Sequence, residues 1–227
     1  MAYRMAVEDV EPNHWVVWGL DLPGFYCRAR SQEEAVALAP TELSRYFAWL
    51  RNHGYRDLLR QNRIEIEIVE TFRSYVSDGM YIVNSFFEDD LRPLEAQEVE
   101  FNLWLLDRTR EDLIASLEQI QPEKKVIAIP NEVHVSILGI LEHIAWTEWW
   151  TFERLDIAAP RAQMPADPYQ LLDTVRAQTK SLLPDLVGKE LVIEKQKERW
   201  SPRKILRRTL WHERDHTHHI TKLGSYI

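Results

Sequence analysis

The sequence contains a single cysteine, Cys27, among its 227 residues. One cysteine excludes an intramolecular disulfide, and it argues against a zinc site built on cysteine thiolates. Any metal ion would therefore have to be held by histidine and carboxylate side chains. A chain of 227 residues is long enough for one large domain or two small ones, each with its own hydrophobic core.

Long apolar runs are missing as well. No stretch reaches the roughly 18 apolar residues that a membrane-spanning helix needs. The N-terminus lacks the charged start, apolar core and small-residue cleavage site of a signal peptide. We therefore expect a cytoplasmic protein with no membrane segment. The net charge of −8 argues against a general nucleic-acid binder, and we expect the local basic stretch at 194–208 to be a solvated helix face.

The first part of the chain has the features of a small α/β domain. β-branched and aromatic segments predict strands at 3–10, 14–20, 25–30, 64–68 and 81–86. Pro23 and Gly24 suit a tight reversal between two of them. Ser31 and Glu34 have the spacing of a capping box, which predicts a helix that continues to about Gly54. Pro40 predicts a kink in this helix, or a break into two consecutive helices.

After Pro93 the hydrophobic period changes from two to about 3.6 residues. This period predicts helices at 98–120, 135–155 and 169–183, and a fourth that begins at Ser201 and Pro202. Four helices with such connections suggest an up-and-down-type bundle. The predicted fold class is therefore α+β, with a small α/β domain at 1–95 followed by a four-helix bundle at 96–227.

The predicted last helix carries a continuous stripe of residues spaced three or four apart. Its members are Ile205, Thr209, His212, His216, His219 and Leu223. Because the stripe begins and ends with apolar residues, we expect its histidines to point into the bundle. His212 and His216 are four residues apart, which places their Cβ atoms about 5–6 Å from each other. Both imidazoles could then reach one metal ion.

A third candidate ligand is His143, on a largely apolar stripe of the second predicted helix. A buried imidazole without a polar partner is costly, and a metal ion would supply that partner. The predicted metal ligands are therefore His143, His212 and His216, with at least one coordination position left open for water or substrate. Three histidines suit zinc, nickel and iron alike.

Structural roles for the same histidines stay open. A histidine pair four residues apart on a helix is often only a structural feature. His219 could support the ligands or belong to the core, and His218 is expected to face sideways. The remaining three histidines have no motif, and we expect ordinary roles for them: His14, His53 and His134.

Two resemblances to known families follow from these residues. HWVVWGLDLPGFYCRARSQEEAVALA, at 14–39, resembles the HicB-like family of small α/β domains over roughly 1–70. HIAWTEWW at 143–150, WSPRK at 200–204 and WHERDHTHHI at 211–220 resemble the DinB-like superfamily of four-helix metal proteins. The second resemblance implies a metal triad of His143, His212 and His216.

The DinB-like superfamily includes enzymes that transfer or use low-molecular-weight thiols. The resemblance implies metal-assisted thiol transfer or hydrolysis, with a small-molecule thiol or an electrophile as the partner. The alternative is a non-catalytic binding or regulatory protein, in which the HicB-like domain binds a ligand or partner and the bundle is structural. The tryptophans Trp146, Trp150 and Trp211 either wall an apolar pocket or pack the bundle. An exposed bundle face would also allow a homodimer.

Overall fold

The computed structural model describes residues 2–11, 14–55, 64–77 and 79–226. It divides into two compact units, one of Met1–Arg92 with Glu194–Arg199 and the other of Pro93–Ile193 with Trp200–Ile227. The α+β class is confirmed, since a mixed sheet with a helix precedes a helical region. The division into domains at 1–95 and 96–227 stays a prediction.

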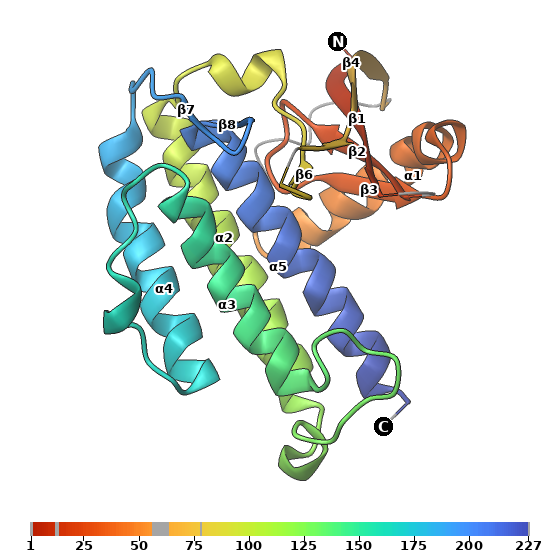
Figure 1. Cartoon of the computed structure of the whole chain (residues 1–227). Helices are drawn as coiled ribbons and strands as arrows, with labels where there is room; N and C mark the ends of the chain where they lie inside the picture. The colour runs from red at the N-terminus through yellow and green to blue at the C-terminus, as the bar shows by residue number, and fades with distance from the viewer. Residues whose placement is uncertain (1, 12–13, 56–63, 78, 227) are drawn as a thin grey trace. The chain divides into compact units, whose positions relative to one another are not determined.

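The first unit is built on a four-stranded mixed sheet with the strand order β3-β2-β1-β4 (Figure 1). The strands are β1 Tyr3–Glu11, β2 His14–Gly19, β3 Tyr26–Ala29 and β4 Ile66–Arg73. β1 pairs antiparallel with β2 and parallel with β4, and β2 pairs antiparallel with β3. Since β1 has a neighbour on each side, it is an inner strand, and Met5, Ala6 and Val7 are fully buried. The predicted strand at 64–68 begins two residues later than expected and continues to Arg73.

Helix α1, Gln32–Asn52, follows the third strand. Ser31 caps it, because its side-chain oxygen accepts a hydrogen bond from the Glu34 amide at 3.1 Å. The Glu34 carboxylate accepts from the Arg30 amide rather than from that of Ser31, so the predicted capping box is only half formed. The helix continues through Pro40, so of the two expected outcomes the break into two consecutive helices does not occur. The apolar face packs on both sides of the proline, where Ala35, Ala39, Leu43 and Leu50 are fully buried.

A buried carboxylate ties the segment after the sheet to β1. Glu8 accepts hydrogen bonds from the Ser85 amide and the Ser85 hydroxyl, each at 2.7 Å, and from the Trp18 indole at 2.9 Å. These donors satisfy an ionised group that would otherwise be costly to bury. The strand expected at 81–86 is reduced to β6 Ile82–Val83, paired with β5 Tyr75–Val76, because residue 85 binds Glu8 instead of a strand.

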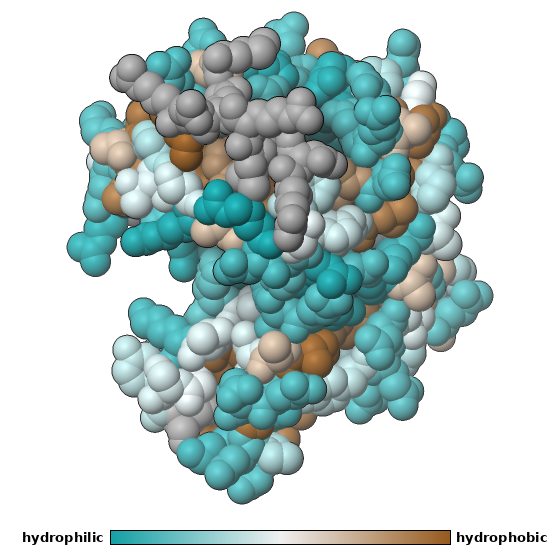
Figure 2. Space-filling model, turned by 180° about the vertical axis from the view of Figure 1, so that it is seen from behind, coloured by the Kyte–Doolittle hydropathy of each residue, from teal (hydrophilic) through white to brown (hydrophobic). Residues whose placement is uncertain are grey.

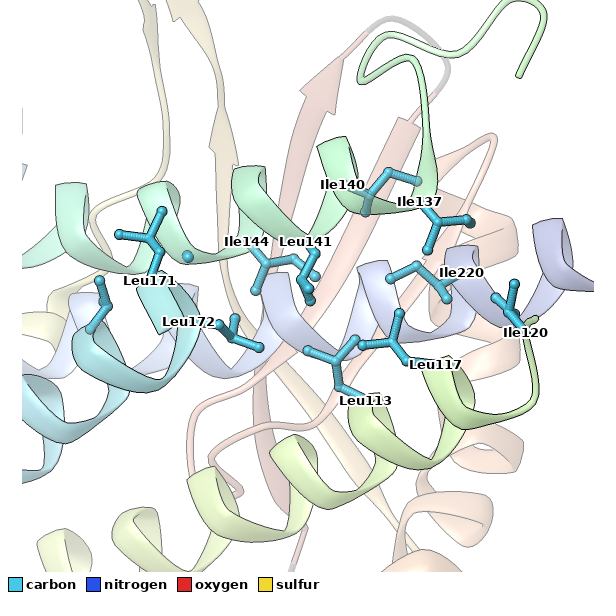
Figure 3. Packing of buried hydrophobic residues seen from close by; sticks show 12 residues of the cluster. Leu113, Leu117, Ile120, Ile137, Ile140, Leu141, Ile144, Leu171, Leu172 and Ile220 are labelled. Atoms are coloured by element: carbon cyan, nitrogen blue, oxygen red, sulfur yellow. The ribbon is translucent and has the colours of Figure 1, made fainter. Parts of the chain in front are cut away.

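The second unit contains four long helices that pack like a bundle (Figure 1). They are α2 Ala96–Glu118, α3 Ile137–Glu153, α4 Pro168–Leu182 and α5 Pro202–Gly224. Each lies within a few residues of its predicted range. Ser201 caps α5 by accepting from the Lys204 amide at 3.2 Å, as expected. Figure 3 shows their aliphatic side chains pointing toward one another in a core that includes Leu113, Leu117, Ile137, Leu141, Ile144, Leu172 and Ile220.

The remaining elements are short. The 3₁₀ helices are η1 Glu88–Leu91, η2 Pro122–Lys124, η3 Arg161–Gln163 and η4 Leu183–Leu186. A hairpin of β7 Ile193–Lys195 and β8 Glu198–Trp200 precedes α5. Its turn residues Gln196 and Lys197 have φ of 55° and 67°, the left-handed conformation of a tight hairpin turn. The sequence reasoning missed this hairpin, because its two strands are only three residues long.

The basic residues that begin α5 are buried. Lys204 is fully buried, with its ammonium nitrogen 4.3 Å from the centroid of the Trp200 ring. The Arg203 guanidinium binds both carboxylate oxygens of Glu98 at 2.8 Å. The expectation of a solvated face is therefore wrong for these residues. Paired charges and an aromatic ring offset part of the cost of burying them.

An ion-pair network crosses the interior of the bundle. Arg176 of α4 donates two hydrogen bonds to Glu148 of α3, at 2.9 and 3.0 Å, and one to Glu213 of α5, at 2.8 Å. Arg110 of α2 donates to Glu213 at 3.0 Å, and the Thr109 hydroxyl donates to it at 2.7 Å. Two arginines and two glutamates thus connect all four helices with balanced charge.

The network determines how Glu213 ionises. Burial alone would raise the pKa of Glu213, but Arg110 and Arg176 outweigh it and lower the pKa to about 2. Burial alone would lower the pKa of Arg176, and Glu148 and Glu213 reverse that effect and raise it. The network is therefore ionic at neutral pH.

The exterior is mostly hydrophilic on the face drawn in Figure 2, where apolar side chains form separate patches. This is the usual surface of a chain whose apolar residues fill interior cores. Among the described residues, no helix combines the length and the apolar character that crossing a bilayer requires.

Candidate metal centre

Four histidines gather beside the N-terminal half of α3 and the C-terminal half of α5. Ring nitrogens of His134, His143 and His216 all lie within 4.8 Å of one another. The Nε2 atom of His212 lies 2.9 Å from Nε2 of His143. His143 comes from α3, His212 and His216 come from α5, and His134 comes from the segment before α3. Three of these imidazoles, from His134, His143 and His216, could hold one metal ion, and the fourth, from His212, lies beside them in contact with His143.

The two helices position their histidines through their buried neighbours. On α5 the most buried side chains near the cluster are Glu213, Thr217 and Ile220, which face the interior. His212 and His216 lie one turn apart beside this face, half-buried, with ring centroids 4.5 Å apart. The sequence predicted that His212 and His216 point into the bundle. Both side chains instead lie at the edge of its core.

On α3, His143 lies between the buried residues Leu141 and Ile144. Its ring centroid is 4.7 Å from that of His212 and 5.0 Å from that of His216. Packing of α3 against α5 thus brings residues about seventy positions apart in sequence into one cluster.

The environment lowers the pKa of three of these imidazoles, those of His134, His143 and His212. Burial, followed by the nearby His134, lowers the pKa of His143 to about 4. Burial, followed by His216 and His143, holds the pKa of His212 well below its ordinary value. Burial also lowers the pKa of His134, although Glu132 opposes this. A neutral imidazole presents a lone pair, which is the form that binds a metal ion.

A carboxylate lies next to the cluster. Oε1 of Glu132 is 3.0 Å from Nε2 of His219, and the His219 ring centroid is 6.0 Å from that of His216. His219 therefore pairs with a residue of the segment before α3. Its two expected roles, support of the ligands or membership of the core, both stay predictions.

His134 was missed by the sequence reasoning, which expected an ordinary role for it. It lies in a loop, where no helical spacing connects it to another histidine. The only local signal was its position two residues before Ser136, the residue that caps α3. The choice of His143, His212 and His216 as the ligand set stays a prediction. The structure adds His134 to the residues that could hold a metal ion.

The tryptophans near the cluster have different surroundings. The Trp211 ring centroid lies 5.9 Å from that of His212. Trp150 packs edge-on against the buried Trp200, with ring centroids 5.1 Å apart, in agreement with a packing role. The ring centroids of Trp146 and Trp149 are 5.6 Å apart. The Arg161 guanidinium carbon lies 4.4 Å from the centroid of the Trp146 ring. Trp211 therefore lies next to a clustered histidine.

A separate cleft of about 590 Å³ lies between α2 and α5. Its polar lining includes Asp112, Ser116, Gln119, Thr217, His218 and Thr221. His218 thus faces this cleft rather than the histidine cluster, in line with its expected sideways direction.

The chain's single cysteine has no part in the cluster. Cys27 belongs to the first unit, where it is buried and its thiol donates to the Ala35 carbonyl at 3.6 Å. Burial, followed by the charge of Glu42, raises the pKa of this thiol to about 11. Cys27 is therefore protonated at neutral pH and unsuited to binding a metal or attacking a substrate.

Comparison with known proteins gives no match, either to family models, to curated proteins or to solved structures. The functional argument therefore rests on the residues and their geometry.

Proposed function

We propose that the protein is a metal-dependent enzyme whose histidine cluster binds one divalent ion. The observation that carries the proposal is the convergence of ring nitrogens from His134, His143 and His216 within 4.8 Å. Zinc, nickel and iron ions all accept imidazole ligands, so the donor set suits any of the three. The lowered pKa values of His134 and His143 favour the neutral form that binding requires.

The proposed first ligands are His143, His212 and His216. Each lies on a long helix. Nε2 of His143 lies 2.9 Å from Nε2 of His212, at the point where α3 and α5 pack together. The same triad follows from the resemblance of this part of the chain to the DinB-like superfamily. The alternative proposal is a non-catalytic binding or regulatory protein, in which a HicB-like first unit binds a ligand or a partner and the bundle is structural.

The proposed reaction is thiol transfer or hydrolysis on a small molecule. A divalent ion with an exchangeable position supplies Lewis acidity, which lowers the pKa of a coordinated thiol or water. Trp211 offers an aromatic surface beside His212 for an apolar part of the substrate. The neighbouring histidines orient the reacting group through their positions on α3 and α5.

Metal analysis of protein purified without a histidine tag tests this proposal. We expect about one equivalent of bound ion per chain after supplementation with zinc, nickel or iron. His216→Ala should abolish this binding, whereas His218→Ala, a change on the same helix that faces the α2–α5 cleft, should retain it. Less than about a tenth of an equivalent in the wild type with every metal would refute the proposal and leave the non-catalytic alternative.

A further inference from the structure

The segment of residues 125–136, which we call the arm, brings His134 to the cluster. It connects η2 to α3, and polar contacts attach it to both α3 and α5. The Leu138 amide at the start of α3 donates to the Lys125 carbonyl at 3.1 Å. Glu132 pairs with His219 of α5 at 3.0 Å. The arm is therefore held against both helices that carry the other clustered histidines.

A glycine in α3 makes room for the arm. A Cβ atom added to Gly139 would lie 1.9 Å from the His134 carbonyl oxygen and 3.1 Å from its carbonyl carbon. No residue other than glycine fits at this distance, because the obstacle is backbone rather than a flexible side chain. Glycine in a helix costs roughly 0.5–1 kcal/mol relative to alanine. This cost is incurred where the backbone of His134 crosses the first turn of α3.

The arm also contains strained backbone on both sides of His134. Asn131 and Val135 have φ of 65° and 64°, in the left-handed region. Such a conformation is unfavourable for a β-branched residue such as Val135 and is typical of functional sites. Local hydrogen bonds hold it, from the Ile129 amide to the Val135 carbonyl and from the Ser136 amide to the His134 carbonyl, each at 2.7 Å.

Little apolar burial stabilises the arm. One apolar residue of the arm, Ile129, is partly buried against the bundle core. Val133 is 86% exposed and Val135 is 58% exposed, and Val126 and Ile127 are exposed as well. A segment with few buried apolar contacts opens at lower free energy than a packed helix does. The arm is therefore the part of the cluster that can move, whereas the helices α3 and α5 are held by the core and the ion-pair network.

The ring of His134 lies where a ligand is expected. It stacks on His143, with centroids 3.9 Å apart and planes 20° apart, and it meets the edge of the His216 ring at 5.9 Å. Nε2 of His212 lies 2.9 Å from Nε2 of His143, so His212 would bring the number of imidazole ligands to four, which saturates a tetrahedral ion. A saturated ion has no position for a substrate unless one ligand leaves.

We propose that His134 is a displaceable fourth ligand, that the arm inserts it into the coordination position a substrate would take, and that Gly139 is the positioning residue that seats it. This inference rests on the proposed metal function. The three helical histidines hold the ion throughout. Release of the Glu132–His219 pair and of the arm from the first turn of α3 would open the site.

Cobalt(II) absorption tests the proposal, since the intensity and position of its visible bands report coordination number. The full chain is freed of metal, loaded with cobalt and titrated with free imidazole. Wild type should show intense four-coordinate bands that imidazole leaves unchanged. His134→Ala should still bind cobalt, with weaker bands of higher coordination number, and imidazole should restore the wild-type spectrum.

Gly139→Ala removes no ligand, so it separates the seating of the arm from the identity of its histidine. It should shift the cobalt bands as His134→Ala does and raise the dissociation constant about tenfold or more. Gly79→Ala is the matched control, because among described atoms an added Cβ there meets nothing within 4 Å. His218→Ala is the control for the histidine change. Both controls should keep the wild-type spectrum.

The outcomes separate the two proposals. Absence of cobalt binding by wild type would overturn the metal function itself. Binding by wild type with an unchanged spectrum in His134→Ala would overturn the fourth-ligand role and leave the metal site. A wild-type spectrum in Gly139→Ala would overturn the seating role of Gly139. If Gly139→Ala does not fold, as judged by circular dichroism, His134→Ala decides the proposal, since it leaves the arm backbone unaltered.

Discussion

Arg176 donates two hydrogen bonds, of 2.9 and 3.0 Å, to Glu148 across the interface of α4 and α3. Both side chains are nearly fully buried, and the same guanidinium also binds Glu213 of α5. The pair is therefore a cross-link inside the bundle rather than a surface ion pair. The contribution of this ion pair to the stability of the fold depends on keeping every charge in the network paired.

Arg176→Met should lower the free energy of unfolding by about 3–5 kcal/mol, because it leaves two buried carboxylates with only Arg110 as a cation. Chemical denaturation followed by circular dichroism measures this loss. Lys180→Ala is the control, since Lys180 binds Asp107 at 2.7 Å in a pair that is about 40% exposed. That control should cost no more than about 1 kcal/mol. Equal losses in the two variants would contradict the structural role of the network.

Acid should weaken the bundle through Glu213. Its pKa is lowered to about 2 from an ordinary 4.5, so its stabilising contribution is present above pH 4.5 and is lost as the pH falls toward 2. That contribution is roughly 3 kcal/mol, since each pKa unit is worth about 1.4 kcal/mol. Glu213→Gln removes the titrating group. The stability gap between wild type and this variant should therefore narrow between about pH 5 and pH 3 in urea titrations. A gap that is constant over this range would show that Glu213 does not carry the effect.

Metal should stabilise the helical unit, because it binds the folded histidine cluster and not the separated residues of the unfolded chain. At about one hundred times the dissociation constant, this linkage adds about 2.7 kcal/mol. The melting temperature should then rise by on the order of 10 °C in differential scanning calorimetry. His216→Ala should lose the shift and His218→Ala should keep it. A shift retained by His216→Ala would place the ion elsewhere.

Glu8 offers a test of the first unit. Its carboxylate accepts hydrogen bonds from the Ser85 amide, the Ser85 hydroxyl and the Trp18 indole. A glutamine at this position would place its NH₂ group, a hydrogen-bond donor, opposite one or more of these donors. Glu8→Gln should cost about 1–3 kcal/mol, measured by denaturation with tryptophan fluorescence. Glu67→Gln, an exposed change on β4, is the control and should stay within about 0.5 kcal/mol of wild type.

Much of the secondary structure could be predicted because its signals are local. Ser201 and Pro202 mark the start of α5, and the 3.6-residue period predicts the four helices within a few residues. The spacing of His212 and His216 is one helical turn, so their common face follows from the helix alone. Shorter elements were predicted less well. The hairpin before α5 has strands of three residues, and α1 continues through Pro40 because an apolar face packs on both sides of it.

The sequence by itself determined the α+β class, the helices and the histidine pair of α5, since each depends on residues close together in the chain. Only the tertiary structure decided that His134 joins the cluster and that Arg110, Glu148, Arg176 and Glu213 form one network. Those contacts link residues separated by 28 to 103 positions within the network, and they arise from the packing of one helix on another. The seat of His134 depends on the close approach of its carbonyl to Gly139. No periodicity records that approach, because it depends on the path of a loop over a helix.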